Sequence, residues 1–216
     1  MNSFRQFTAR IRLQLRGKNQ VIGWRMTPDE AIAFFSRQPK TALTFLGFSA
    51  GYENENEMFQ VVRVILSGHS PETTLINIGA TDGGIGAAYP LAKSLGFTTT
   101  GIVSTKALDD GAEISEAVDY VCFIADDQWG GKLPDSNELS PTSKAMVACS
   151  DVMIGIGGGE ISRDEMAAAK AQGKPVYFYP VEMEHASAIQ RAEKMGLPKP
   201  DSFWGEAYEV FGKQQM

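Results

Sequence analysis

A chain of 216 residues, of which 43% are hydrophobic and 21% charged, can bury a core without disulfides or structural metals. Its two cysteines and two histidines stand far apart, which excludes a disulfide framework and a zinc site, and we expect no bound metal. The net charge of −6 disfavours nucleic acid as a partner.

The first 26 residues form a basic segment. Between residues 9 and 16 apolar residues alternate with arginine and glutamine, and this two-residue period is typical of a strand rather than of a transit-peptide helix. We predict a strand or a hairpin that turns near residues 17–19. We treat 1–26 as a basic extension of a domain that spans 27–216, and its charge suits either a solvated face or a surface that docks on a second subunit.

From residue 27 onward, apolar runs alternate with helix-like stretches. Thr27, Pro28 and Glu30 predict a helix that begins with a capping box. Buried strands are expected over 41–48, 74–78, 98–103, 119–125, 151–156 and 176–180. Helices are expected over 53–67, 84–95, 112–118, 142–149, 160–172, 183–195 and 203–211. This alternation is typical of a doubly wound, mainly parallel α/β sheet of Rossmann-like type.

Three of the predicted strands run into turns that are rich in glycine. Glycine lets a ligand approach the main chain closely, and the helix that follows such a turn offers unpaired N–H groups to an anion. We predict that the turns meet at the carboxyl edge of the sheet and bind a nucleotide or a nucleotide-derived small molecule, with its phosphate at the helix after Gly159. The alternative is that they are tight turns without a ligand. The residues expected to contact the ligand are Gly47, Phe48, Ser49, Gly79, Thr81, Asp82, Gly83, Gly84, Trp129, Gly157, Gly158, Gly159, Glu160 and Ser162.

Two common nucleotide motifs fit poorly. The sequence has no GxxxxGK[ST] phosphate loop. Residues 79–86 nearly match the TGxxxGIG turn of short-chain dehydrogenases, and Tyr89 and Lys93 have the YxxxK spacing of that family. However, this turn follows the second strand of the core, and no acidic residue ends strand 98–103 to bind a ribose. An NAD(P)-binding oxidoreductase therefore remains a further alternative, and we expect no resident cofactor.

Taken together, the three turns resemble those of the LOG family. This family comprises cytokinin-activating phosphoribohydrolases, long described as lysine decarboxylases, within the SLOG superfamily of Rossmann-like nucleotide binders. The resemblance covers about 41–182, where residues 47–49 and 79–87 are similar to the family's first two turns and residues 157–165 to its PGGxGTxxE motif. The positions that match this motif are Gly158, Gly159 and Glu165, with Ser162 in place of threonine.

The sequence departs from the family pattern at several positions. Gly157 replaces the motif's proline and Ile161 its third glycine. Ser143 and Lys144 stand where the family carries an Arg-Lys pair, so the arginine that assists its reaction is absent. These departures favour a nucleotide sensor or binding protein over an enzyme. A domain without activity that serves an oligomer is another alternative.

If the site is catalytic, the resemblance implies cleavage of the N-glycosidic bond of a nucleoside 5′-monophosphate. Glu165 would stabilise the sugar cation or guide water, Asp82 would orient the ribose, and Lys144 would supply a positive charge. Each has a structural alternative, as a first-turn helix residue, a helix cap and a solvated helix residue respectively. In the long loop 126–141, Trp129 could stack on a base or fasten the loop to the body.

The expected partners follow from the same observations. No apolar run approaches the ~18 residues of a membrane span, so we expect a cytoplasmic protein that does not bind membranes. The family resemblance implies a homodimer or a higher homo-oligomer. The ligand is expected to be a nucleotide or a related small molecule.

Overall fold

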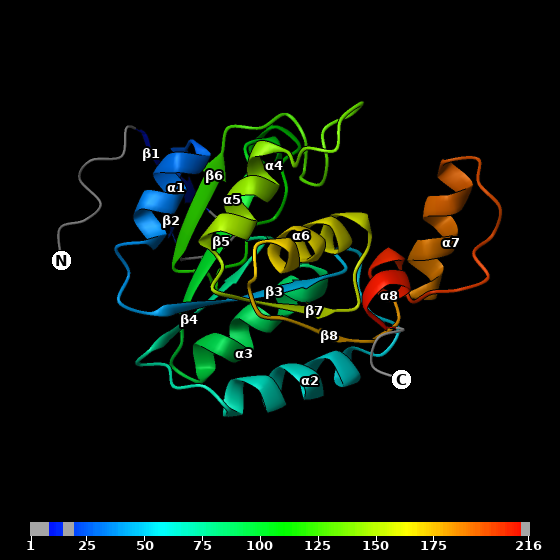
Figure 1. Cartoon of the computed structure of the whole chain (residues 1–216), viewed down its shortest axis with the longest axis horizontal. Helices are drawn as coiled ribbons and strands as arrows, with labels where there is room; N and C mark the ends of the chain where they lie inside the picture. The colour runs from blue at the N-terminus through cyan, green and yellow to red at the C-terminus, as the bar shows by residue number, and fades with distance from the viewer. Residues whose placement is uncertain (1–8, 15–19, 213–216) are drawn as a thin grey trace.

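The computed structural model describes residues 9–14 and 20–212, and in this part of the chain eight strands form one sheet with helices on both faces (Figure 1). The order across the sheet is β1-β2-β6-β5-β4-β3-β7-β8, in which β2 to β8 run parallel and β1 is antiparallel to β2. The strands are β1 (Ala9–Gln14), β2 (Gln20–Met26), β3 (Thr41–Gly47), β4 (Thr74–Ile78), β5 (Thr98–Ser104), β6 (Tyr120–Ile124), β7 (Val152–Ile156) and β8 (Val176–Tyr179). The sequence-based prediction of a mainly parallel Rossmann-like sheet is confirmed.

The helices form a layer on each face of the sheet. Helices α2 and α3 pack on one face, and α1, α5, α6 and α8 pack on the other, while α7 stands apart from the body near the end of β8 (Figure 1). Their bounds are α1 (Pro28–Phe35), α2 (Glu55–Ser67), the 3-10 helix η2 (Gly84–Ala87), α3 (Ala88–Ser94), α4 (Lys106–Asp109), α5 (Pro141–Cys149), α6 (Glu160–Ala171), α7 (His185–Lys194) and α8 (Glu206–Phe211).

Two cores, one beneath each helical layer, account for the unbroken apolar runs in the sequence. Along β3, Leu43 and Phe45 face the core under α2 and α3, whereas Ala42 and Leu46 face the core under α1, α5 and α6. Because successive side chains of a strand point to opposite faces, a strand covered on both sides must be apolar at nearly every position. Cys122 is fully buried in this way on β6.

The predicted N-terminal hairpin is confirmed in its two strands. β1 pairs with β2 from Ala9 opposite Arg25 to Gln14 opposite Gln20. The predicted turn near residues 17–19 lies outside the described residues. β2 also pairs in parallel with β6, so the hairpin continues the main sheet. The capping box predicted for α1 is present.

One predicted helix is wrong. Residues 112–118 were expected to be helical, but they form an irregular segment, and the short α4 lies earlier in the chain. The reason is main-chain pairing with the turn after β4. The N–H of Ser115 donates to the carbonyl of Ala80, and the carbonyl of Glu113 accepts from the N–H of Asp82. These bonds extend the segment along that turn.

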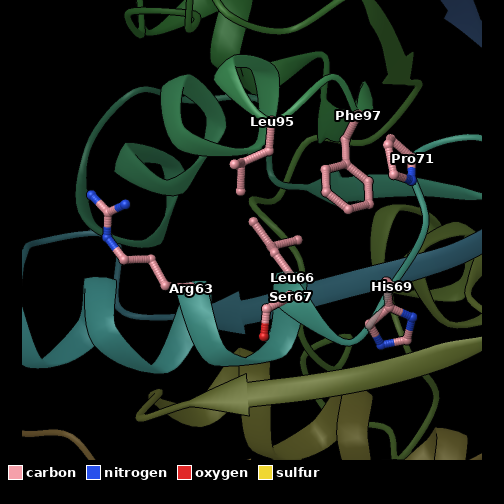
Figure 2. A pocket seen from close by; sticks show the side chains of 7 residues that line it. All are labelled: Arg63, Leu66, Ser67, His69, Pro71, Leu95 and Phe97. Atoms are coloured by element: carbon pink, nitrogen blue, oxygen red, sulfur yellow. The ribbon is translucent and has the colours of Figure 1, made fainter.

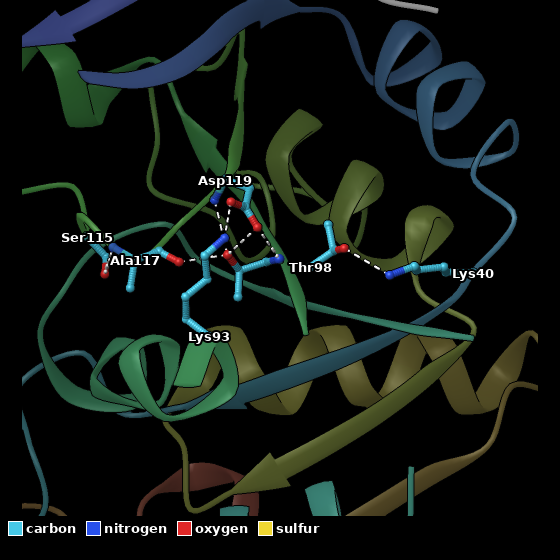
Figure 3. A network of polar contacts seen from close by, with 7 residues as sticks. Lys40, Lys93, Thr98, Ser115, Ala117 and Asp119 are labelled. Atoms are coloured by element: carbon cyan, nitrogen blue, oxygen red, sulfur yellow. Dashed lines mark hydrogen bonds and ion pairs between the residues drawn. The ribbon is translucent and has the colours of Figure 1, made fainter. Parts of the chain in front are cut away.

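The amino edge of the sheet is held together by polar side chains (Figure 3). Lys40 Nζ donates to Thr98 Oγ1 at 2.9 Å. Asp119, before β6, accepts from the N–H of Thr99 at 3.0 Å and forms an ion pair with Lys93 of α3. These contacts fix the starts of β5 and β6 at the edge opposite the glycine-rich turns.

The order of strands reverses at β3. From β3 the chain passes through α2 to β4 on one side, whereas β7 lies on the other side of β3 and leads through α6 to β8. In open α/β sheets this reversal creates a crevice beyond the carboxyl ends of the two adjacent strands, and ligands bind there. The crevice falls between the turns after β3 and β7.

Candidate functional site

A cleft of about 790 Å³ occupies the carboxyl edge where β3, β4 and β7 end. This volume lies within the range of pockets that hold small molecules. The structure brings most of the predicted site residues to its wall. Those that line it are Gly47, Phe48, Ser49, Gly79, Thr81, Asp82, Gly83, Trp129, Gly159, Glu160, Ser162 and Glu165. Four predicted residues lie elsewhere, namely Gly84, Gly157, Gly158 and Lys144.

Three of these four hold the turns against one another. Gly84, Gly157 and Gly158 have φ angles of +57°, +59° and +132°, which favour glycine. A Cβ on Gly84 would lie 1.9 Å from the carbonyl oxygen of Phe48, and one on Gly157 would lie 2.4 Å from that residue's ring. A Cβ on Gly158 would lie 2.6 Å from the Cβ of Ser162. At these positions the tight-turn interpretation accounts for glycine without a ligand.

Two other glycines leave the main chain open to the cleft. A Cβ on Gly79 would meet no heavy atom within 4 Å, and one on Gly159 would meet only a carboxylate oxygen of Glu206, at 3.3 Å. Neither residue has a positive φ. Packing therefore does not explain the absence of a side chain at these positions, whereas close approach of a ligand does.

The β4 turn contains a strained residue. Ala80 has a φ of +65°, a region that costs free energy for any residue with a side chain. Its N–H donates to the hydroxyl of Tyr89 at 3.1 Å, and that hydroxyl donates to the carbonyl of Thr100 at 2.7 Å. Tyr89 is thus a buried support of the turn, and Lys93 points to the opposite edge (Figure 3). The YxxxK spacing brings neither residue to the cleft.

The N-terminus of α6 opens onto the cleft. Gly159 is its N-cap residue, so no side chain caps the first turn, and Glu160, Ile161 and Ser162 of that turn line the cleft. The hydroxyl of Ser162 donates to the carbonyl of Gly47 at 3.2 Å, which ties the helix to β3. An uncapped helix start presents N–H groups and the positive end of the helix dipole, which together favour an anion.

Acidic residues outnumber basic residues on the wall of the cleft. Asp82, Glu113 and Glu160 are exposed acids on its wall, and Arg191 is the one basic residue among the described residues that line it. Arg191 comes from α7, where it lies one turn after Ser187. Both residues line the cleft, together with Met183, which precedes the helix.

Glu165 lies on the floor of the cleft and is buried. Its carboxylate accepts a hydrogen bond from Ser143 Oγ at 2.5 Å, and that oxygen accepts from the N–H of Gly131 at 2.7 Å. The pKa of Glu165 is raised to about 8, chiefly by burial; the Ser143 hydrogen bond lowers it in part, and the neighbouring charge of Asp164 makes a smaller upward contribution. At pH 7 the carboxyl group is therefore mostly protonated.

Lys144 does not reach this carboxyl group. Its side chain is about half exposed and pairs with Glu138 at 2.9 Å on the surface. The position where the family resemblance suggested a cation therefore provides none to the cleft. The hydrogen bond from Ser143 is what the structure places beside Glu165 instead.

Trp129 fastens its loop and also lines the cleft, while stacking on a base stays a prediction. Its Nε1 donates to Asp110 Oδ2 at 3.1 Å, which fastens the 125–140 loop, and its ring lines the cleft. The base of the loop is held by Asp126, whose carboxylate accepts from the N–H groups of Gln128 and Thr142.

Several lining residues escaped the sequence analysis. Glu113 lies in the segment that was expected to be a helix, and Thr142 and Met146 lie one turn apart on α5. Ser187 and Arg191 lie on α7. None belongs to a recognised motif. The four-residue spacing on α7 was visible in the sequence, but it does not show which helix face meets the cleft.

A smaller hollow of about 350 Å³ lies at the amino edge (Figure 2). Its lining is mainly apolar, from Leu66, Pro71, Leu95 and Phe97, with Arg63, Ser67 and His69 around it. It lies away from the switch point, and we assign it no role. Within residues 9–14 and 20–212, no group of three or more His, Cys, Asp or Glu residues could hold a metal ion. No helix in this part of the chain is long and apolar enough to cross a membrane.

The chain was compared with protein-family models, curated proteins and solved structures. No protein-family model matches the sequence, and no curated protein matches it. Two solved structures of the molybdenum cofactor carrier protein from Chlamydomonas reinhardtii are 22% identical over 64% and 65% of this chain and 76% of that chain, each with a TM-score of 0.47. A structural genomics target, TM1055, is 19% identical over 63% of this chain and 72% of that chain, with a TM-score of 0.46.

The topology and the switch-point cleft place this chain in the class of Rossmann-like α/β proteins. Likeness at these identities concerns the path of the chain and carries no argument about a ligand. The LOG family resemblance is not confirmed at the level of a family.

Proposed function

We propose that this protein binds a small nucleotide-type molecule with a single phosphate in the cleft. The observation that carries the proposal is the open main chain at the switch point. At Gly79 and Gly159 there is space for a Cβ, so the packing of the protein does not require glycine there. The uncapped start of α6 lies on the same wall. Together they form a surface of backbone groups suited to a phosphate.

Arg191 supports a phosphate at this wall. Because it is the one basic residue among the described lining residues, it supplies the counter-charge that an anion there requires. Its guanidinium group can bind two phosphate oxygens at once. The phosphate then lies between the start of α6 and α7.

The acids of the cleft limit the charge of the ligand. Asp82, Glu113 and Glu160 line the same cleft, in which Arg191 is the one cation among the described lining residues. A second or third phosphate would add negative charge near these carboxylates without a further cation among the described lining residues, which disfavours diphosphates and triphosphates.

Binding without catalysis is the function that the site supports best. Ser143 stands where the family pattern has its arginine, and Lys144 is paired with Glu138 outside the cleft. A sensor or carrier needs the open turns and the helix start, and it needs neither of those cations.

A second candidate rests on the raised pKa of Glu165. A carboxyl group that is protonated at pH 7 inside a cleft can act as a general acid. In a phosphoribohydrolase, Glu165 would donate its proton to a nitrogen of the leaving base as the N-glycosidic bond breaks. Water would add to the anomeric carbon and return a proton to the Glu165 carboxylate, which restores the acid and releases ribose 5-phosphate.

One panel experiment separates these functions. The protein is mixed with nucleoside 5′-mono-, di- and triphosphates, NAD⁺ and NADP⁺, and both thermal unfolding and release of free base are followed. A monophosphate at 100 times its Kd should stabilise the protein by about 2.7 kcal/mol, or raise its midpoint by about 5–10 °C. Base release would favour the hydrolase. The proposal is contradicted if only diphosphates, triphosphates or dinucleotides shift the unfolding midpoint. It is also contradicted if none of the nucleotides shifts the midpoint.

A further inference from the structure

The floor of the cleft contains a hydroxyl group without a partner. Thr142 lies in the first turn of α5, its side chain is 3% exposed, and it lines the cleft. Its N–H donates to Asp126 Oδ2 at 2.9 Å. Its Oγ1 is the one buried side-chain nitrogen or oxygen atom among the described residues that lacks a hydrogen bond. Such an atom costs free energy and requires an explanation.

Other buried hydroxyl groups nearby are paired. Thr44 Oγ1 shares a hydrogen bond of 2.6 Å with Ser150 Oγ and accepts from Asn77 Nδ2 at 3.2 Å. Ser143, the residue after Thr142, uses its hydroxyl both as donor and as acceptor. The unpaired group is therefore not a general property of this core. Ser162 is also buried and lines the cleft, but its hydroxyl donates to the carbonyl of Gly47 at 3.2 Å. Among the described residues that line the cleft, Thr142 is the one with a buried hydroxyl that has no partner.

The surroundings of Thr142 select an uncharged group. Leu46, Ile102 and Met146 supply apolar side chains to the same cleft, and all three are buried. Glu165, also buried there, is held neutral at pH 7 by its raised pKa. A phosphate placed among these groups would lose its hydration without gaining a cation. A flat heterocycle with a polar edge would gain both burial and a hydrogen bond.

We propose that the ligand enters base first, with its heterocyclic base on the floor beside Met146 and hydrogen-bonded to Thr142 Oγ1, and its phosphate at the start of α6 nearer the mouth. This inference rests on the proposed function and adds an orientation and a specificity-determining residue to it. Ile161, which is 39% exposed on the first turn of α6, is consistent with that helix start lying near the mouth.

The test compares two probes in the full chain. The first is whichever of adenosine, guanosine, cytidine and uridine 5′-monophosphate the wild type binds best, and the second is ribose 5-phosphate, which has no base. Thr142→Val keeps the size of the side chain and removes the hydroxyl. It should weaken nucleotide binding about tenfold and leave binding of ribose 5-phosphate unchanged. Its unfolding midpoint should equal or exceed that of the wild type, because an unpaired buried hydroxyl is removed.

Two control variants distinguish recognition from packing. Thr142→Ser keeps the hydroxyl and should keep the nucleotide affinity. Thr44→Val removes a buried hydroxyl that is paired, so it should lower the midpoint and leave the affinity unchanged.

The outcomes separate this inference from the proposed function. If the wild type binds the nucleotide and Thr142→Val binds it equally well, the orientation is wrong while the proposed function stands. Equal weakening of both probes, or a midpoint lowered as in Thr44→Val, also overturns the inference. If the wild type binds neither probe, the proposed function fails and this inference fails with it.

Discussion

The protonated state of Glu165 makes the stability of this protein depend on pH. The pKa of its carboxyl group rises from 4.5 to about 8 on folding, chiefly because the group is buried. Between these values the folded state retains a proton that the unfolded state has lost. The contribution of this proton to the free energy of unfolding is therefore fully present below pH 4.5 and is lost as the pH rises to about 8. Above that pH both states are ionised and the contribution is level.

The magnitude follows from the width of this window. Each pH unit in which only the folded state holds the proton lowers the free energy of unfolding by about 1.4 kcal/mol. Across the window from pH 4.5 to about 8 the loss approaches about 5 kcal/mol. That is a large fraction of the roughly 5–15 kcal/mol typical of a folded domain.

Glu165→Gln isolates this contribution, because the amide is neutral at every pH and its carbonyl can still accept the Ser143 hydrogen bond. Urea unfolding from pH 5 to 9 gives the free energy of unfolding of each protein. The wild-type value minus the Glu165→Gln value should fall by about 1.4 kcal/mol per pH unit up to about pH 8 and then stay level. Glu160→Gln, which removes an exposed carboxyl group from the same helix, is the control. A difference that does not change with pH would refute the buried, protonated state.

Three further predictions concern the turns and the charges around the cleft. Gly84→Ala should lower the free energy of unfolding by more than Gly111→Ala, because both glycines have positive φ but only at Gly84 would a Cβ overlap the main chain. Denaturation should show a loss of about 1–2 kcal/mol for Gly111→Ala and a larger loss for Gly84→Ala. Equal losses would contradict the role assigned to packing at Gly84. Arg191→Ala should weaken monophosphate binding about 2–5-fold in calorimetry, an effect that salt reduces, while Lys194→Ala on the same helix should not; equal effects would remove Arg191 from the site. Lys144→Met should leave the affinity unchanged, and a clear loss would return Lys144 to the cleft.

Most of the fold could be predicted because its signals are local. The six apolar runs from 41–48 to 176–180 correspond to β3 to β8. Thr27 and Glu30 marked the start of α1 by a capping box that is present. The helix predicted over 112–118 is absent because main-chain hydrogen bonds of this segment go to a turn about thirty residues earlier in the chain. Long-range pairing of this kind leaves no local pattern.

The site was predicted in part for the same reason. Glycine clusters and the rule for open sheets located the wall formed by Gly79 and Gly159. The sequence could not distinguish these open glycines from Gly84, whose absent side chain is a matter of packing. Nor could it show that Lys144 points outward, or that the hydroxyl of Thr142 has no partner, since both depend on the three-dimensional contacts of α5.

The proposed ligand approaches the open main chain at Gly79, on the wall of the cleft where β4 ends. Valine at this position adds a side chain to open space, at a φ that needs no left-handed conformation, so the variant should fold like the wild type. Gly68→Val makes the same change outside the cleft, where a Cβ would meet only the carbonyl of Ile65 at 3.5 Å. The measurement is calorimetric titration of the three proteins with the nucleoside 5′-monophosphate that most stabilises the wild type. Gly79→Val should lose at least tenfold in affinity, about 1.4 kcal/mol, with an unchanged unfolding midpoint, while Gly68→Val should bind normally. Normal binding by Gly79→Val would contradict the approach of the ligand at this residue.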